Sequence, residues 1–321
     1  MKKFNKVMSA SIIGLACAGV MGNAQAGALA TSVLTMSNFL LNYANGLAVD
    51  PTSITSNSNG TTVSAQLNNS AGVTNAPNVN STNYTVTAEQ GSTPANITTF
   101  PLISATPTAP TTTFAAGVAS ASGNPLVSPG AVVQNASYIS LAGQGSGNVS
   151  NATNALNVTF TVTAAGDLQF SFDTSLYREN FLSAGASAGS QARTASSFTF
   201  NILDNTNTPV FQWSPAGAAV GGTSTATVNV PLTQTSHISS SGVSYAYYIN
   251  SSNQFVNGTA GSPILGSFTA DVALNPGTYT LTGTMTTNAS ASYIPEPGAL
   301  ALMGIGLLGL VVGQRRKSKF N

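Results

Sequence analysis

Very few side chains of this chain could serve as a nucleophile, a base or a soft metal ligand. His237 is the only histidine, and the only cysteine, Cys17, lies near the N-terminus. A Ser-His-Asp triad would have to use His237 as its base, but this histidine lies in a polar segment, 234–239, without a nucleophile motif. We expect His237 to lie on the surface, and we expect the protein not to be an enzyme.

Carboxylates are the other reactive groups, because a pair can hydrolyse a glycosidic bond and a cluster can bind calcium. Residues 27–294 contain seven of them: Asp50, Glu89, Asp167, Asp173, Glu179, Asp204 and Asp271. Asp173 with Glu179, or Asp204 with Asp271, would form a pair only if the fold brought them together. A calcium site around Asp167, Asp173 or Asp204 is an alternative, although no spacing matches a calcium-binding loop. We expect no metal and no cofactor, and we interpret these acids as turn residues that bond their own backbone.

Three aromatic residues could bind a carbohydrate, because flat rings stack on sugar rings. Trp213 lies in the segment Val210–Pro215, and Tyr245 and Tyr247 fall on one face of a predicted strand. The alternative is that these rings fill the core of a β-sheet protein, as large aromatic side chains usually do.

The charge of the chain is low and unevenly distributed. Charged residues make up 5% of its 321 residues, against about 25% in an average soluble domain. Residues 27–294 contain seven acids, two arginines and no lysine, so their net charge is −5. Binding to nucleic acid requires clustered basic residues, and we therefore expect no nucleic-acid partner.

The N-terminus has the three parts of a secretory signal. Three lysines within the first six residues precede a mostly apolar stretch, and Ala24-Gln25-Ala26 supplies the small-x-small pattern that a signal peptidase recognises. We predict that residues 1–26 are a signal peptide, that the Sec machinery exports the chain, and that cleavage leaves Gly27 first. An uncleaved membrane anchor is the alternative.

A second apolar run covers residues 298–313, and the basic residues Arg315, Arg316 and Lys317 follow it. As a helix this run would be about 24 Å long, somewhat short of a hydrocarbon core of roughly 30 Å, and local thinning accommodates the difference. Basic flanks stay in the cytoplasm. We therefore predict a single transmembrane helix over 298–313 with a basic cytoplasmic end, 314–321, rather than a buried core helix.

The triplet Pro295-Glu296-Pro297 immediately precedes this apolar run. The order of triplet, glycine-rich apolar run and basic cluster over residues 294–319 closely resembles the PEP-CTERM sorting domain, found in Gram-negative bacteria that make extracellular polysaccharide. The resemblance implies that an exosortase, a membrane-embedded transpeptidase-like enzyme, recognises and processes the tail. The two prolines keep the backbone extended, so we expect the triplet to lie at the membrane surface within reach of such an enzyme.

The segment between these ends is predicted to be all-β. Residues 154–164 alternate apolar and polar side chains, and 168–172 continue the alternation after Gly166-Asp167, which predicts a hairpin over 154–174. Further strands are predicted at 32–41, 84–88, 196–203, 225–230, 243–249, 268–274 and 278–285, with a turn at Asn275-Pro276-Gly277. Short strands separated by turns indicate an antiparallel β-sandwich or jelly-roll.

The composition changes along this segment. Residues 51–130 are dense in Ser, Thr, Asn, Gly and Pro and poor in large apolar residues. We therefore predict a Ser/Thr/Asn-rich region of edge strands and loops over 27–130 and a β-sandwich body over 131–290. A partly disordered arm over 51–130 is the alternative.

Together these features predict an exported protein that lies transiently in the inner membrane, with its body in the periplasm, and then reaches the cell surface or extracellular matrix. We expect a structural or adhesive component associated with exopolysaccharide, because the body is nearly uncharged and rich in hydroxyl and amide groups. A carbohydrate-binding module is the first alternative, and a secreted hydrolase is the second.

Overall fold

The structure is a computed structural model of the chain. It describes residues 27–47, 49–50, 56–57, 59–76, 78–79, 83–92, 110–127, 129–183, 186–187, 189–214, 217–220, 222–226, 234–239, 254–257 and 264–294. The predicted signal peptide, the predicted strand over 243–249 and the predicted tail beyond Ile294 lie outside these residues. Within the described part of the chain every regular element is a β-strand, as the alternation predicted.

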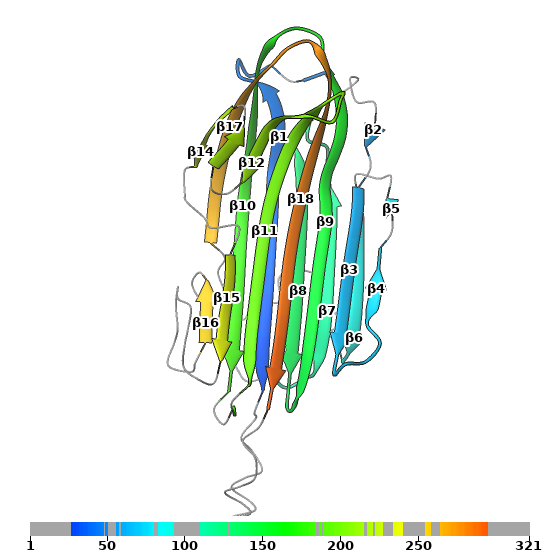
Figure 1. The fold of residues 1–321 in the computed structure, drawn as a ribbon, viewed down its shortest axis with the longest axis vertical. Coiled ribbons are helices and arrows are strands. Elements are labelled where there is room, and N and C mark those ends of the chain that lie inside the picture. Colours follow the sequence, from blue (N-terminus) through cyan, green and yellow to red (C-terminus); the bar gives the residue numbers. More distant parts are fainter. Residues whose placement is uncertain are drawn as a thin grey trace, which may run out of the picture.

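The strands form two antiparallel sheets that pack face to face (Figure 1). The first sheet has the spatial order β14 (Gly222–Ala226), β17 (Ile264–Leu274), β10 (Gly166–Leu182), β1 (Ala28–Tyr43), β8 (Ala131–Leu141), β7 (Phe114–Ser122) and β6 (Tyr84–Gly91), and β16 (Gln254–Asn257) also pairs with β10. The second sheet has the order β13 (Gly217–Val220), β12 (Pro209–Ser214), β11 (Gln191–Asp204), β18 (Gly277–Tyr293), β9 (Gly145–Val162), β3 (Asn59–Leu67) and β4 (Val73–Asn75). Three short strands pair alongside it: β15 (Gln234–Ser239) with β11, β2 (Ser56–Asn57) with β9, and β5 (Asn78–Val79) with β3.

The described chain enters and leaves the sandwich at the same end, which distinguishes that end from the other. β1 begins and β18 ends at the lower end in Figure 1. The registers agree, because Ala28 lies opposite Leu182 and Ser292 lies opposite Gln191, on either side of the β10–β11 connection. We call this the terminal end of the sandwich and the opposite one the distal end.

The predicted hairpin over 154–174 is wrong, although both of its strands exist. β9 ends at Val162 in the second sheet and β10 begins at Gly166 in the first, so the chain crosses from sheet to sheet. Alternation requires each strand to bury one face, and two strands satisfy that requirement either side by side or facing each other across the core. The sequence pattern alone does not separate these two arrangements.

The predicted turn Asn275-Pro276-Gly277 makes a second crossing between the sheets. β17 ends just before it in the first sheet, and β18 begins at Gly277 in the second. The hydroxyl of Tyr279 donates a hydrogen bond to the carbonyl oxygen of Asn275 at 2.9 Å. This bond ties the start of β18 back to the corner and fixes its direction.

β1 is an interior strand, paired with β10 on one side and β8 on the other. The composition of residues 27–130 predicted edge strands and loops for that region, whereas β1 lies in the middle of the first sheet. Of the strands in this region, β6 and β4 do take edge positions, one in each sheet. Strands from 27–130 and 131–290 therefore share the same two sheets, and the apolar alternation of β1, rather than the polar composition of residues 51–130, decides its place.

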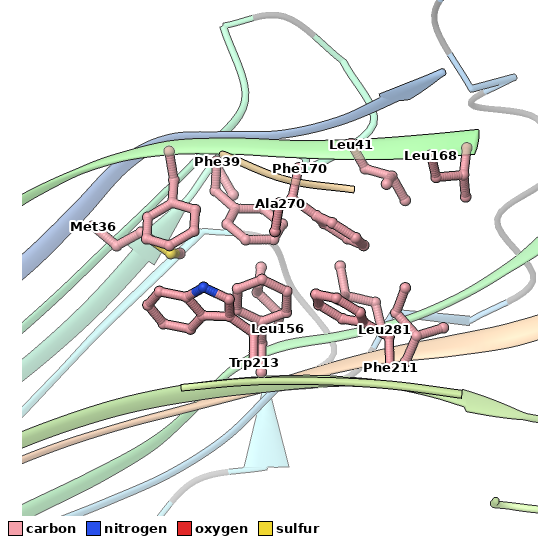
Figure 2. Close-up of a cluster of buried hydrophobic side chains, with 14 of the residues drawn as sticks. Met36, Phe39, Leu41, Leu156, Leu168, Phe170, Phe211, Trp213, Ala270 and Leu281 are labelled. Carbon is pink, nitrogen blue, oxygen red and sulfur yellow. The ribbon is translucent and has the colours of Figure 1, made fainter. Parts of the chain in front are cut away.

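Aromatic side chains fill the distal half of the interior. Phe200 lies at the centre, with its ring centroid 5.1 Å from Trp213, 5.2 Å from Phe170 and 5.6 Å from Phe39. Figure 2 shows Phe39, Phe170 and Ala270 projecting from one sheet toward Trp213 and Phe211 on the other. The alternating residues that the sequence indicated as strand faces thus form one continuous hydrophobic core.

Small side chains fill the terminal half. Its buried cluster consists mainly of alanine and valine: Ala28, Ala30, Val63, Ala65, Ala115, Ala119, Val149, Ala192, Ala289 and Ala291 are among its members. Gly117 on β7 also lies here, and a Cβ added to it would be 2.4 Å from Asn151 Oδ1 and 2.6 Å from Val63 Cγ1. The two sheets are therefore closely packed in this half.

A layer of buried polar side chains joins the two sheets in this region. Asn135 Nδ2 donates to the carbonyl oxygen of Met285 at 2.9 Å, and Ser137 Oγ donates to that of Thr287 at 2.9 Å. Thr153 Oγ1 in turn donates to Asn135 Oδ1 at 2.7 Å. Each of these bonds runs from one sheet to the other. A side chain as short as serine can reach the opposite sheet only where the facing residues are small and the sheets lie close together.

Candidate functional site

The first described residue, Gly27, is held at the terminal end by Ser183, which follows β10. The N–H of Gly27 donates to Ser183 Oγ at 2.6 Å, and Ser183 donates back to the Gly27 carbonyl oxygen from both its N–H and its Oγ, each at 3.0 Å. A Cβ on Gly27 would lie 2.1 Å from the carbonyl oxygen of Leu141, so no other residue fits. The predicted signal peptidase site therefore falls where the folded sandwich begins.

The last described residue, Ile294, is held by two serines of the same β10–β11 connection. Its carbonyl oxygen accepts hydrogen bonds from Ser187 N at 2.9 Å, Ser187 Oγ at 3.0 Å and Ser190 Oγ at 3.1 Å. The N–H of Ile294 donates to Ser190 Oγ at 3.0 Å. We call Ser187 and Ser190, with these four bonds, the serine clamp.

The backbone of the β10–β11 connection is shaped to bring these serines to Ile294. Gly189 has φ +94°, a left-handed conformation that favours glycine, and Ser190 N donates to Ser187 O at 3.0 Å across the turn. Ser292 Oγ also donates to the Gly189 carbonyl oxygen at 3.0 Å. One connection thus fixes both the entry of β1 and the exit of β18.

Charge is divided unequally between the two halves of the sandwich. Of the charged residues in 27–294, the distal half holds five aspartates and no basic residue. The aspartates are Asp50, Asp167, Asp173, Asp204 and Asp271. The terminal half holds two acids and two bases: Glu89, Arg178, Glu179 and Arg193. The net charge of −5 therefore belongs to the distal half, and the terminal half is neutral.

Three of the five aspartates, Asp173, Asp271 and Asp204, accept hydrogen bonds from neighbouring side chains. Asp173 accepts from Asn38 Nδ2 at 2.8 Å, and Asp271 accepts from Gln169 Nε2 at 2.9 Å. Asp204 accepts from Thr206 Oγ1 at 2.6 Å, and this bond and those from the turn backbone lower the pKa of its carboxyl. Within the described residues no three His, Cys, Asp or Glu side chains come together to hold a metal ion. His237 lies on β15, and its side chain is outside what the structure describes.

Trp213 is a core residue, so its prediction as a sugar-stacking residue is wrong. Its side chain is 3% exposed, and its ring stacks on Phe200 at an interplanar angle of 16°. The pairing of β12 with β11 places it opposite Phe200, on the inner face of the sheet. Tyr245 and Tyr247, the other two predicted stacking residues, lie outside the described residues.

A pocket of about 470 Å³ opens at the distal end. It is lined by the turn after β1 and by the β9–β10 crossing, with Tyr43, Asn45, Leu47, Thr163 and Asp167 among the lining residues. Leu47 is 64% exposed. The pocket therefore combines an aromatic ring, an exposed apolar side chain and polar side chains suited to hydroxyl groups, and sequence patterns gave no sign of it.

Sequence reasoning also missed a buried charged pair at the terminal half of β10. Arg178 and Glu179 are 0% and 1% exposed and lie on opposite faces of the strand. The hydroxyl of Tyr177 donates to Glu179 Oε2 at 2.5 Å, and burial together with this carboxylate raises the pKa of Tyr177. The signal was present in the sequence, because two adjacent charges and Asn180 lie between the apolar pairs Leu176-Tyr177 and Phe181-Leu182.

The remaining predicted site residues lie outside the described part of the chain. They are Ala24 and Ala26 at the signal cleavage site, Pro295, Glu296 and Pro297 of the triplet, and Arg315, Arg316 and Lys317 of the basic cluster. Among residues that the structure describes, no helix has the length and apolar character needed to cross a bilayer. The predicted transmembrane helix over 298–313 falls outside them.

Residues 294–317 match the PEP-CTERM protein-sorting motif. The resemblance inferred from the triplet, the apolar run and the basic cluster is thereby confirmed. The chain therefore carries a PEP-CTERM sorting motif at its C-terminus, and such a motif implies that the protein is exported and that an exosortase processes it. The match begins at Ile294, the residue that the serine clamp holds.

Comparison with curated proteins finds no match. Among solved structures, the infectious bursal disease virus Gx strain is 10% identical, with 85% of this chain and 63% of that chain covered and a TM-score of 0.10. The VP2 subviral particle of the same virus is 13% identical, with 91% and 88% covered and a TM-score of 0.09. Likenesses this weak give no support to any function.

Proposed function

We propose that this protein is a non-enzymatic structural or adhesive component of the cell surface or extracellular matrix, associated with exopolysaccharide. In this proposal the signal peptide over 1–26 directs export through the Sec machinery and is removed before Gly27. The helix over 298–313 then holds the body on the periplasmic side of the inner membrane, and exosortase processing releases it toward the surface.

The observation that carries this proposal is the position of the sorting motif relative to the fold. The motif begins at Ile294, directly after β18, and β1 begins one residue after the predicted signal cleavage site. Both ends therefore leave the sandwich at its terminal end, held by one connection. A body anchored this way has its neutral half toward the membrane and its five aspartates at the opposite end.

The low charge of the body supports association with a neutral polymer through hydroxyl and amide groups. Such contacts are little affected by ionic strength, whereas exposed ion pairs weaken as the Debye length falls to about 3 Å at 1 M salt. We expect cells washed in 1 M salt to retain the protein and cells treated with a hydrolase of their own exopolysaccharide to release it. Complete release by salt alone would contradict the proposal.

A carbohydrate-binding module is the second candidate function, and the distal pocket favours it. The pocket lies at the end of the sandwich farthest from the sorting motif, where an extracellular polymer would meet an anchored body. The ring of Tyr43 could stack on a sugar, while Asn45 and Asp167 could bond its hydroxyl groups. This candidate replaces Trp213, which is buried, with residues that line an open pocket.

Affinity electrophoresis in gels containing the purified exopolysaccharide tests this candidate. We expect Tyr43→Ala and Leu47→Ala to lose the retardation that the parent shows, with the melting temperature of Leu47→Ala unchanged because that side chain is 64% exposed. Val127→Ala, which changes an exposed apolar residue outside the pocket, is the matched control. Unaltered retardation of both pocket variants would rule out the pocket as the binding site.

A further inference from the structure

The serine clamp holds the chain at the boundary between the folded body and the sorting motif. Ile294 is the first residue of the matched motif and the residue before Pro295 of the triplet. Four hydrogen bonds join its N–H and carbonyl oxygen to Ser187 and Ser190. Ser190 is fully buried, so its hydroxyl has a fixed position from which it both accepts from and donates to Ile294.

Only three residues separate this fixed point from the apolar run. The distance from Ile294 to Gly298 spans four Cα–Cα steps, which reach at most about 14 Å in a fully extended chain. With the run in the membrane, as the proposed function has it, the terminal end of the sandwich lies against the membrane surface. The triplet is then confined to a narrow zone between the two.

A tether this short limits where a processing enzyme finds its substrate. A flexible exit from the body would let the triplet sample many positions, and holding a reacting segment in place accounts for a large part of enzymatic rate enhancement. The residue before a proline is already restricted to extended conformations. The serine clamp also fixes the position of Ile294, so both the starting point and the direction of the triplet are restricted.

We propose that Ser187 and Ser190 are positioning residues for exosortase processing. By fixing Ile294 to the β10–β11 connection, they present the triplet at a defined place only after β10, β11 and β18 have assembled. Tail removal is thereby coupled to folding of the sandwich. This inference rests on the proposed membrane placement of the tail and goes beyond it in naming residues of the body that act on processing.

Pulse-chase labelling of the full chain in the producing cell, with the processed fraction followed by mass, tests this directly. We expect Ser187→Ala with Ser190→Ala to slow tail removal about tenfold, the change that corresponds to about 1.4 kcal/mol. A second variant inserts Gly-Ser-Gly-Ser between Ile294 and Pro295, leaves every clamp bond in place, and is expected to slow processing similarly because it frees the triplet.

The matched control is Ser197→Ala with Thr286→Val. It removes a part-buried hydroxyl pair, 2.6 Å apart, from β11 and β18 away from the exit. We expect it to be processed at the parental rate. The melting temperature of each processed body is measured alongside, so that a loss of stability is separated from a loss of positioning.

Each outcome decides the proposal. Slow processing of the clamp and insertion variants, with an unaffected control of equal stability, supports it. A parental rate in either the clamp variant or the insertion variant overturns it, and so does equal slowing in a control that has lost the same stability. If the parent chain itself kept its tail in cells that contain the exosortase, the membrane placement and processing of the tail would be wrong, a failure distinct from that of the clamp.

Discussion

The two halves of the sandwich bury their interiors in opposite ways. The distal half packs aromatic rings around Phe200, whereas the terminal half packs alanine, valine and glycine and joins its sheets through buried polar side chains. Large rings hold facing strands apart, and small side chains let them approach until a serine reaches the opposite backbone. The distal half should therefore be sensitive to lost volume and the terminal half to added volume.

The largest effect is expected from removing a ring at the centre of the distal half. Phe200→Ala should lower the free energy of unfolding by about 3–5 kcal/mol, because a buried phenylalanine leaves a cavity that its neighbours only partly fill. Urea unfolding of the body measures this. Leu47→Ala, at an exposed position of the same half, should change stability by less than about 0.5 kcal/mol. Equal effects of the two substitutions would contradict the description of this core.

Adding a single methyl group should damage the terminal half. Gly117→Ala places a Cβ 2.4 Å from Asn151 Oδ1 and 2.6 Å from Val63 Cγ1, and we expect a loss of about 1–3 kcal/mol from overpacking. Gly143→Ala is the matched control, because nothing lies within 4 Å of its added Cβ. If the two alanine variants unfolded at the same urea concentration, the close packing inferred for this half would be wrong.

The polar layer between the sheets should show coupling between its partners. Ser137→Ala should cost about 1–2 kcal/mol, because it leaves buried groups of Thr287 without the bonds they make at 2.9 and 3.0 Å. Adding Thr287→Val should recover part of that loss, since removing both partners leaves fewer unsatisfied groups. A double-mutant cycle by urea unfolding measures the coupling, and strict additivity would argue against a sheet-to-sheet bond.

Alkaline conditions should destabilise the protein through Tyr177, a buried tyrosine of the terminal half. The pKa of Tyr177 is raised above 10 in the folded protein by burial and by Glu179. Its contribution to stability is therefore complete below pH 10 and is lost as the pH rises above that value, because the unfolded chain releases the proton more readily. Tyr177→Phe should flatten the decline of unfolding free energy above pH 10. An unchanged slope would show that another group is responsible.

Acid should lower the stability of the protein through Asp204 in the distal half, and we expect this effect to be the smallest of those described. The pKa of Asp204 is lowered by hydrogen bonds from Thr206 and Thr208 in its exposed turn. Its contribution is present above its usual value near 3.8 and is lost as the pH falls through the lower folded-state value. Asp204→Asn should therefore reduce the acid dependence of the melting temperature slightly below pH 4. A larger change near neutral pH would contradict this origin.

The sequence predicted where the strands lie along the chain better than it predicted which strands pair with each other. Period-two alternation located β1, β6, β9, β10 and β11, because burying one face of a strand is a local requirement. It did not predict that β9 and β10 lie in different sheets, since that choice depends on strands more than a hundred residues away, such as β18. The turn at Asn275-Pro276-Gly277 was correct as a turn but gave no information on which sheets it joins.

The same limit applies to the functional residues. The sorting motif was predictable because its parts are contiguous in the sequence and act in the order in which they occur. The sequence left Trp213 as either a sugar-stacking ring or a core residue, because its segment gave no sign of which face is inward. Its pairing with Phe200 decides that it lies in the core. Ser187 and Ser190 were unremarkable among many serines, and their meeting with Ile294 depends on residues 104 or more positions apart.

The intact mass of the protein recovered from the cell surface tests most directly whether both ends are removed from the folded body. We expect a chain that begins at Gly27, ends at or near the Pro295-Glu296-Pro297 triplet, and contains none of the apolar run over 298–313. Recovery of a surface protein whose mass includes both residues 1–26 and residues 298–321 would contradict this expectation.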